Sequence, residues 1–524
     1  MTLRTSAVLS AALALAASAA PSYPPAAAPV PAGALPSAGL SREQAAATIT
    51  PADLHARIEF LASDQMRGRD TPSPELEIAA GHLVSQYRLM GFQPGGENGT
   101  FYQWWPYPLR QLNAAEASFD LTSPGGTLRL APGRDFYSAG GTVRPIQSAM
   151  LVWAGDGPDA VLTEGAARGQ VAVVAIPGPY SRNWRIERNR LRNAAQRAGA
   201  AAVAYVLDPA WTADSIARYA QVAQSPSRSA GGEPAFPQFY LSHDAARRVL
   251  QAGGLSLDEL SRLDSIPHTV PFAGATVTAG LPQRTLDEGR APNVVAVLPG
   301  SDPALRNEFV VLSAHMDGVG VGEPVNGDSI YNGADDDATG TTGLLEVAQA
   351  MAQLGVRPRR SVVFLHVSGE EKGLLGSEWY SDHPTLPLAQ IVANVNVDMI
   401  GRNAPDSVVV IGKDYSTLGD VANRLDAEHP ELGLTLSDDP WPEQRFFFRS
   451  DHFNFARKEV PAIFFFSGVH ADYHRPSDEL QTLDLDKAAR ISRMIFYLAY
   501  AVANDPQRPR WDPEGLAEVR SLTR

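Results

Sequence analysis

The chain has 524 residues, a formal net charge of -14 and no cysteine. Hydrophobic residues make up 44% and charged residues 19%, an ordinary balance for globular proteins. The length predicts two or three domains. The sequence has no basic block, which argues against nucleic acid as a partner. Without cysteine the chain forms no disulfide, so its core depends on packing alone.

The first residues predict a secretory signal peptide over 1–19. Arg4 supplies the positive charge, Ala7–Ala17 is apolar but too short to span a bilayer, and Ala17-Ser18-Ala19 fits a cleavage site. The alternative is a disordered alanine-rich start. No later run of about 18 apolar residues follows, so we expect no transmembrane anchor. The expected protein is exported, either periplasmic or secreted.

Residues 20–42 are rich in Ala and Pro, a composition typical of a linker. Residues 43–114 predict helices that belong to the main domain. Thr50-Pro51 is a favourable helix start, and the apolar residues of the following ten positions have helical spacing. A second helix fits Glu75–Met90.

Short β-prone runs separated by Gly and Pro turns distinguish residues 115–288. Ala149–Trp153 and Gln170–Ile176 predict strands, and a helix over Arg188–Ala198 precedes a strand over Ala201–Leu207. We expect a β-rich domain inserted into the main domain. The alternative is that these residues decorate the main sheet.

Strands and helices alternate over residues 289–505, and residues 506–524 follow as a C-terminal tail. Most of the expected strands are continuous apolar runs, which is typical of strands buried on both faces. The fold class is therefore α/β, a three-layer α/β/α domain with a mixed, mostly parallel sheet. The expected strands are Asn293–Leu298, Phe309–Ser313, Ser361–His366, Ile391–Val397, Ser407–Ile411 and Ala462–Phe466, and the expected helices are Ala338–Leu354, Tyr415–Glu428 and Leu485–Ala503.

Polar residues follow the ends of several expected strands, where open α/β sheets bind their ligands. Taken singly, each group has an ordinary explanation, since an acidic triplet often caps a helix and a Glu-Glu pair is often a solvated turn. Together, so many carboxylates at one edge would repel each other unless divalent cations bound them. The residues concerned are His315, Asp317, Asp335–Asp337, Glu370, Glu371, Asp398 and His474.

Mixed histidine and carboxylate ligands suit zinc, with Co²⁺ or Mn²⁺ as substitutes. The HExxH pattern of single-zinc helix sites does not occur in the sequence. The acidic triplet also lacks the alternating spacing of an EF-hand calcium loop.

Six motifs occur in a fixed order: AHMDG, NGADDDATG, SGEEKGLLGS, NVDMIG, RSDHFNF and DYHRPSD. As a set they resemble the zinc exopeptidases that include aminopeptidase Y, bacterial leucyl aminopeptidases and glutamate carboxypeptidases. The resemblance covers Asn293–Ala503 strongly and Leu54–Phe92 weakly. It implies a zinc aminopeptidase-like fold in which 43–114 begins the peptidase domain and 289–505 completes it. Residues 115–288 resemble a protease-associated domain, through GQVAVV and AGAAAVA.

The resemblance implies a site for two Zn²⁺ ions. Asp335, which follows His315 by 20 residues as in the aminopeptidase branch, would bridge both ions. His315 and Asp398 would complete one site. Glu371 and His474 would complete the other.

The resemblance also gives roles to residues beside the ions. Glu370 would be the general base for attack by a metal-bridged hydroxide on the peptide carbonyl. Asp317 would hydrogen-bond the ring of His315 and fix its tautomer. Tyr473 would stabilise the oxyanion, and Arg449 would contact the substrate.

The expected function is hydrolysis of peptide substrates from an apolar N-terminal residue, with Phe446–Phe448 as candidates for the side-chain pocket. A carboxypeptidase or dipeptidase on the same scaffold stays open, because Arg445 and Arg449 could bind a substrate carboxylate. A non-catalytic, receptor-like binding protein is the third alternative, and the complete ligand set disfavours it. His366 and His470 match no motif role and are left out of the metal set.

Overall fold

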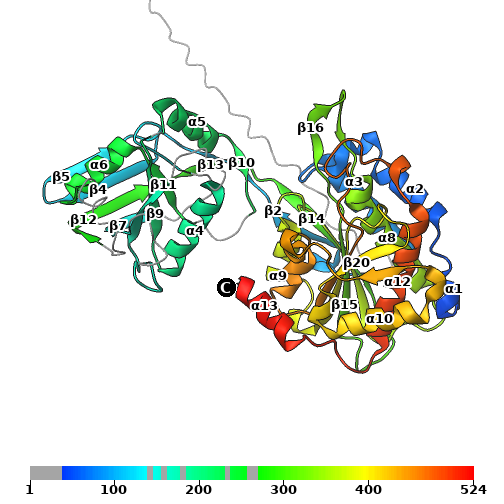
Figure 1. The fold of residues 1–524 in the computed structure, drawn as a ribbon. Helices are drawn as coiled ribbons and strands as arrows, with labels where there is room; N and C mark the ends of the chain where they lie inside the picture. The colour runs from blue at the N-terminus through cyan, green and yellow to red at the C-terminus, as the bar shows by residue number, and fades with distance from the viewer. Residues whose placement is uncertain are drawn as a thin grey trace, which may run out of the picture.

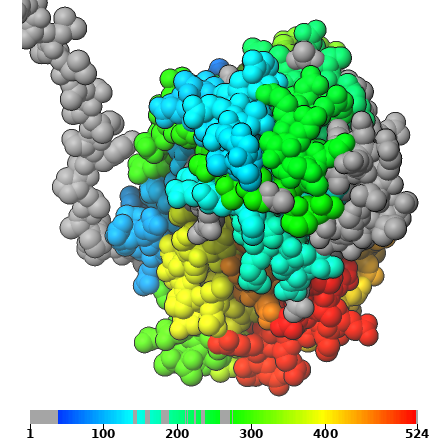
Figure 2. Space-filling view, turned by 90° about the vertical axis from the view of Figure 1, so that its left-hand side faces the viewer, coloured from blue at the N-terminus to red at the C-terminus, as the bar shows by residue number. Residues whose placement is uncertain are grey.

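The computed structural model describes residues 38–138, 145–154, 162–176, 184–209, 211–230, 236–256 and 270–523. The signal peptide expected at 1–19 and most of the linker expected at 20–42 lie outside these residues. The described residues form two lobes (Figure 1). The middle of the chain forms one of these lobes. Figure 2 views the molecule from the side of that lobe, so it lies in front of the other lobe. Within the described residues no helix is both long and apolar enough to cross a membrane.

The main lobe is built on a nine-stranded mixed sheet in the order β1-β14-β18-β15-β19-β22-β20-β21, with β2 also paired to β14. The four central strands β18, β15, β19 and β22 are parallel, whereas β14, β20 and β21 run in the opposite direction. The strands are β1 (Gln93–Pro94), β2 (Tyr102–Pro106), β14 (Arg290–Leu298), β15 (Phe309–His315), β18 (Ser361–Val367), β19 (Ile391–Val397), β20 (Ser407–Ile411), β21 (Thr435–Ser437) and β22 (Ala462–Phe466).

Helices cover both faces of this sheet. Successive side chains of a strand point to opposite faces, so one strand contributes apolar side chains to two cores. In β14, Val294 and Ala296 belong to one core, and Val295 and Val297 belong to the other. The first core is covered by α1 (Arg42–Ala46), α2 (Pro51–Leu61), α3 (Pro74–Leu89), α8 (Gly340–Ala352), α10 (Thr417–Glu428) and α12 (Leu485–Asn504). The second is covered by α9 (Leu375–Asp382), α11 (His452–Ala456) and α13 (Pro513–Thr523). The three-layer α/β/α class is therefore confirmed.

The second lobe contains an eight-stranded sheet in the order β5-β4-β12-β7-β8-β9-β11-β6, with two cores of its own. A three-stranded sheet, β10-β3-β13, lies between the lobes (Figure 1). The elements are β3 (Leu109–Leu112), β4 (Ser118–Ser123), β5 (Gly126–Leu130), β6 (Phe136–Ser138), β7 (Ile146–Trp153), β8 (Val171–Ile176), α4 (Trp184–Arg197), β9 (Ala202–Leu207), α5 (Ala213–Gln224), β10 (Ser227–Arg228), β11 (Gln238–Leu241), α6 (His243–Ala252), β12 (Val270–Gly280) and β13 (Gln283–Asp287). The resemblance of this lobe to a protease-associated domain stays a prediction.

Two parts of the main lobe were not expected from the sequence. A hairpin of β16 (Gly320–Val325) and β17 (Asp328–Tyr331) lies in the sequence between the expected site residues Asp317 and Asp335. Helix α13 forms within the expected C-terminal tail and buries Val519. Trp511, just before it, donates its indole N–H to the carbonyl of Glu459 at 2.7 Å.

Candidate metal centre

The expected ligands meet at one edge of the main sheet because they follow the carboxyl ends of neighbouring parallel strands. His315 is the last residue of β15, and Asp398 directly follows β19. Glu371 lies in the loop after β18, and His474 lies in the loop after β22. The helical turn Ala334–Thr339, which precedes α8, brings a further carboxylate to the same place.

Asp336 lies between the two histidines. Its Oδ1 is 3.2 Å from Nε2 of His315, and its Oδ2 is 3.1 Å from Nε2 of His474. On the first side, Oδ1 of Asp398 is 3.6 Å from Nε2 of His315. On the second side, Oε2 of Glu371 is 3.0 Å from Nε2 of His474. One carboxylate therefore faces two half-sites, each with a histidine and a second carboxylate.

The position expected for Asp335 is corrected by this geometry. The Asp335 side chain is fully buried and is not among the residues whose ligand atoms gather in the two half-sites. Its Oδ1 accepts hydrogen bonds from the N–H of Gly401 at 2.7 Å and from Oγ1 of Thr339 at 3.1 Å, and its Oδ2 lies 3.3 Å from Nε2 of His470. The residue spacing pointed to the first aspartate of the triplet, but the backbone of the turn directs the second one into the site.

The third aspartate of the triplet, Asp337, also approaches the first half-site, but its carboxylate oxygens already accept hydrogen bonds from main-chain N–H groups. Asp337 offers one ligand atom within 4.8 Å of those of His315 and Asp398. However, its Oδ1 accepts from the N–H of Gly340 at 2.8 Å and of Met399 at 3.1 Å, and its Oδ2 accepts from the N–H of His315 at 3.3 Å. Asp337 therefore ties the half-site loops together.

The donor set fits divalent cations. Within the described residues, several buried atoms that face one another make no hydrogen bond, although buried polar atoms normally do. Two imidazole nitrogens with surrounding carboxylate oxygens are ligands that zinc prefers. The atoms are Nε2 of His315, Oδ2 of Asp336, Oε1 of Glu371 and Oδ1 of Asp398.

The electrostatics of the cluster supports the same interpretation. Burial opposes the charged form of His474, yet the carboxylates of Asp336 and Glu371 raise its pKa to about 10. Burial also opposes the charged form of His315, and Asp398 and Glu370 nevertheless raise the pKa of its imidazole well above the usual value. Without a metal ion, protons on the two imidazoles balance the charge of the carboxylates. Metal binding would release these protons.

Glu370 and Asp317 lie beside the half-sites. Burial, together with the negative charge of Asp398, raises the pKa of the Glu370 carboxyl well above its usual value. Oδ1 of Asp317 accepts the N–H of Glu370 at 3.3 Å. The same oxygen lies 3.7 Å from Nδ1 of His315, and the Asp317 carbonyl is nearer, at 3.2 Å. The main chain of Asp317 is thus the closer partner of the His315 ring.

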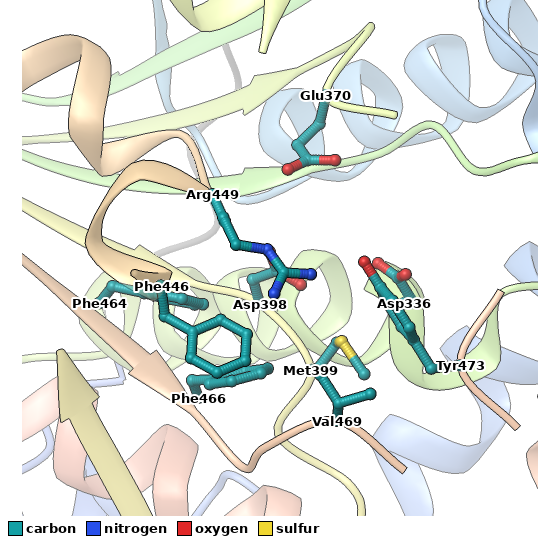
Figure 3. A pocket seen from close by; sticks show the side chains of 10 residues that line it. All are labelled: Asp336, Glu370, Asp398, Met399, Phe446, Arg449, Phe464, Phe466, Val469 and Tyr473. Carbon is teal, nitrogen blue, oxygen red and sulfur yellow. The ribbon is translucent and has the colours of Figure 1, made fainter. Parts of the chain in front are cut away.

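A pocket opens beside the first half-site (Figure 3). Glu370 and Arg449 point into it from one side, and Tyr473 stands across from them near Asp336. The guanidinium of Arg449 lies 4.6 Å from the centre of the Phe446 ring. The apolar part of the wall is formed by Met399, Phe446, Phe464, Phe466 and Val469.

The three consecutive phenylalanines divide between pocket and core. Phe446 lines the pocket and packs on Phe466 at 5.0 Å between ring centres. Phe447 is buried against Tyr415 and His452, and Phe448 does not line the pocket. Arg445 lies over the Phe448 ring at 4.8 Å and is also outside the pocket lining.

His366 and His470, the two histidines left out of the expected metal set, have other partners. His366 is buried against the Tyr87 hydroxyl at 2.7 Å, and His470 faces Asp335. Asp478 is a supporting residue that the sequence analysis did not single out. Its carboxylate accepts the N–H groups of Asp335 and Asp336 at 3.0 and 3.1 Å and so holds the turn that presents Asp336. Its place in the DYHRPSD motif was the only signal.

Known proteins resemble part of the chain. Leupeptin-inactivating enzyme 1 of Streptomyces exfoliatus is 28% identical over 220 residues, which cover 42% of this chain and 44% of the relative. Leucine aminopeptidase 2 of Trichophyton equinum is 30% identical over 232 residues, which cover 43% of this chain and 42% of the relative. The chain thus spans about half the length of the curated relatives it matches.

Among solved structures, an aminopeptidase from Aneurinibacillus sp. strain AM-1 matches with a TM-score of 0.47 and 18% identity, over 90% of this chain and 97% of that one. A zinc aminopeptidase from Bacillus subtilis matches with a TM-score of 0.45 and 17% identity, over 87% and 98%. The family model described as Peptidase family M28 matches residues 293–499, the segment that carries all five residues of the two half-sites. Over residues 293–499, the chain is therefore similar to peptidase family M28.

Proposed function

We propose that the chain is a co-catalytic two-zinc aminopeptidase. The observation that carries this proposal is the position of Asp336, which faces His315 with one oxygen and His474 with the other. His315, Asp336 and Asp398 would hold one ion. Asp336, Glu371 and His474 would hold the second. When bound, such a pair of ions would lower the pKa of the attacking water and polarise the peptide carbonyl.

Glu370 is the proposed general base. Its carboxylate points into the pocket but is not one of the half-site residues (Figure 3). It would accept the proton of the attacking water at its carboxylate oxygen and then donate that proton to the leaving amine. The partly buried setting, which raises the pKa of Glu370, makes such a proton easier to hold.

Tyr473 and Arg449 are proposed to bind the reacting carbonyl. Both side chains line the pocket that contains Glu370 and Asp398. The phenol O–H and the guanidinium are donors that can stabilise the negative charge of a tetrahedral carbonyl oxygen. Burial and the charge of Asp336 raise the pKa of the Tyr473 phenol, so its O–H stays protonated as a donor.

The apolar wall of the pocket supports aminopeptidase activity on apolar N-terminal residues. Met399, Phe446 and Val469 offer a leucine-like side chain a surface that excludes water. Burying such a side chain contributes about 1.5–3 kcal/mol. Several of the relatives are named leucine aminopeptidases, which agrees with this preference.

One observation favours a second candidate, a carboxypeptidase or dipeptidase. Arg449 points into the pocket and could bind the carboxylate of a short peptide. Hydrolysis of leucine p-nitroanilide compared with that of an N-blocked dipeptide separates the two functions. An aminopeptidase cleaves the first and not the second, and cleavage of the blocked dipeptide alone would overturn the proposal.

Export is proposed on the sequence alone. Arg4, the apolar run Ala7–Ala17 and the Ala17-Ser18-Ala19 site support a signal peptide. The proposed compartment is the periplasm or the medium. N-terminal sequencing of the mature protein tests it, since cleavage after Ala19 is expected and an intact Met1 in an exported fraction would contradict it.

A further inference from the structure

A short N-terminal segment, Arg67–Thr71, lies against the loops of the metal centre although about 250 residues separate them in the sequence. Arg69 is its central residue, and its side chain is buried, with 1% of the residue exposed. A buried guanidinium needs partners for its N–H groups. The guanidinium of Arg69 donates to four main-chain carbonyls, those of Leu61, Met316, Asn332 and Gly333.

Three of those carbonyls, all except that of Leu61, belong to the loops that present His315 and Asp336. Met316, whose carbonyl accepts from Nε of Arg69 at 3.1 Å, directly follows His315. Asn332 and Gly333, whose carbonyls accept from Nη1 at 2.8 Å and Nη2 at 3.0 Å, precede the turn that presents Asp336. One rigid planar group therefore fixes the distance between the loop of His315 and the loop of Asp336.

The backbone of the segment is held in a costly conformation. Arg67, Gly68 and Arg69 have φ values of +45°, +67° and +49°. A Cβ on Gly68 would lie 2.7 Å from the carbonyl oxygen of Gly320 and closer still to that of Tyr331, so the segment packs directly on the β16–β17 hairpin. Non-glycine residues persist in this region where their surroundings over-determine them, and such residues cluster at functional sites.

Thr71 connects the same segment to the loop of the proposed base. Its Oγ1 donates to Oδ2 of Asp317 at 3.0 Å and accepts the N–H of Gly369 at 3.0 Å. Oδ1 of Asp317 accepts the N–H of Glu370. The hydroxyl of Thr71 thus couples the Asp317 carboxylate to Gly369 and Glu370, both in the loop after β18.

We propose that Arg69 and Thr71 are positioning residues of the metal centre, Arg69 for the spacing of His315 and Asp336, and Thr71 for the orientation of Glu370. This inference rests on the proposed function, which gives those residues their roles. Neither side chain touches the substrate pocket. Their loss should therefore change the geometry and turnover of the site more than its affinity for substrate.

The test compares Thr71→Val, which keeps the shape but removes the hydroxyl, with Thr71→Ser, which keeps the hydroxyl. Thr48→Val is the matched control, since Thr48 donates to the carbonyl of Ala45 far from the site. We expect kcat for leucine p-nitroanilide to fall at least about tenfold in Thr71→Val with KM changed less than about twofold, and to recover largely in Thr71→Ser. Wild-type kcat in folded Thr71→Val would overturn the role of Thr71.

The absorption spectrum of the Co²⁺-substituted protein gives a readout that does not depend on turnover. Arg69→Lys keeps the positive charge and loses the planar fork, so its Co²⁺ spectrum should differ from the wild type while Thr48→Val matches it. An unchanged spectrum in folded Arg69→Lys and Thr71→Val would overturn the inference. If the wild-type chain cleaves no peptide, the proposed function fails, and altered spectra in these two variants would still support positioning.

Discussion

Asp335 and Asp336 are consecutive in the sequence, yet their carboxylates serve different partners. Asp336 lies within 3.2 Å of the His315 imidazole, whereas Asp335 lies 3.3 Å from that of His470, on the loop that leads to Tyr473 and His474. Both side chains are buried and each has an oxygen, Oδ2, without a hydrogen bond, but Oδ2 of Asp335 faces His470 whereas Oδ2 of Asp336 faces His474. The two residues should therefore respond differently to the same substitution.

Asp336→Asn should lose zinc from both half-sites and reduce activity by more than about 10³-fold, because it removes the shared negative ligand. Asp335→Asn keeps the ligands and should retain zinc, with activity reduced by about 10- to 100-fold through the loops that Asp335 supports. Elemental analysis after zinc loading, combined with rates on leucine p-nitroanilide, measures both. Equal zinc loss in the two variants would argue against the assignment of Asp336.

The neighbouring glutamates offer a second comparison. Glu370→Gln should retain zinc and a folded structure but lose about 10²–10⁴-fold in kcat, because an amide cannot accept and return the proton. Glu371→Gln should instead weaken zinc binding, since Glu371 faces His474 within 3.0 Å. Zinc content and kcat are measured on both proteins, and full activity in Glu370→Gln would remove that residue from its role.

The pocket wall predicts the preferred substrate. Leucine p-nitroanilide should be cleaved with a kcat/KM about 10–100-fold above that of glycine p-nitroanilide, as expected for burying one apolar side chain. Val469→Asp should reduce this preference, because Val469 lines the apolar wall. A wild-type preference for glycine or for an acidic residue would contradict the assignment of the pocket.

Acid sensitivity should arise in part from a histidine away from the metal centre. His452 stacks on Phe464 at 5.0 Å, and burial lowers the pKa of its imidazole to about 3. Between that value and the unfolded value of about 6.5, the unfolded chain binds a proton that the folded chain does not, so stability falls as the pH falls through this window.

His452→Phe should remove this loss. The free energy of unfolding of His452→Phe, taken relative to the wild type, should therefore be about 2 kcal/mol more favourable at pH 5 than at pH 8. Urea unfolding at several pH values measures the difference. His383→Phe is the matched control, because it makes the same substitution at an exposed histidine. The same pH dependence in His452→Phe and the wild type would show that His452 does not contribute.

The sequence was sufficient for the parts of the fold that depend on strong local patterns. The continuous apolar runs predicted β19, β20 and β22 with the bounds that the structure gives, and the Thr50-Pro51 start predicted α2. The motifs also led to His315, Glu371, Asp398 and His474 at one edge of the sheet. These assignments were possible because strand ends and caps are encoded within a few residues.

Long-range geometry could not be predicted in this way. Three consecutive aspartates give no pattern that separates Asp335 from Asp336, since the turn before α8 and the carboxylate of Asp478 decide which one points inward. Arg69 and Thr71 gave no signal either, because their partners lie about 250–300 residues away. Helix α13 was missed since it depends on packing against the main lobe, where Val519 is buried.

The central claim is that one carboxylate, Asp336, serves two zinc ions in a hydrolytic site. Titration of Zn²⁺ into metal-free protein, with bound zinc and leucine p-nitroanilide hydrolysis measured at each step, tests it most directly. We expect saturation at two zinc ions per chain with activity rising as they bind, and no such rise in Asp336→Asn. Saturation below one zinc per chain, or full activity in the metal-free protein, would contradict it.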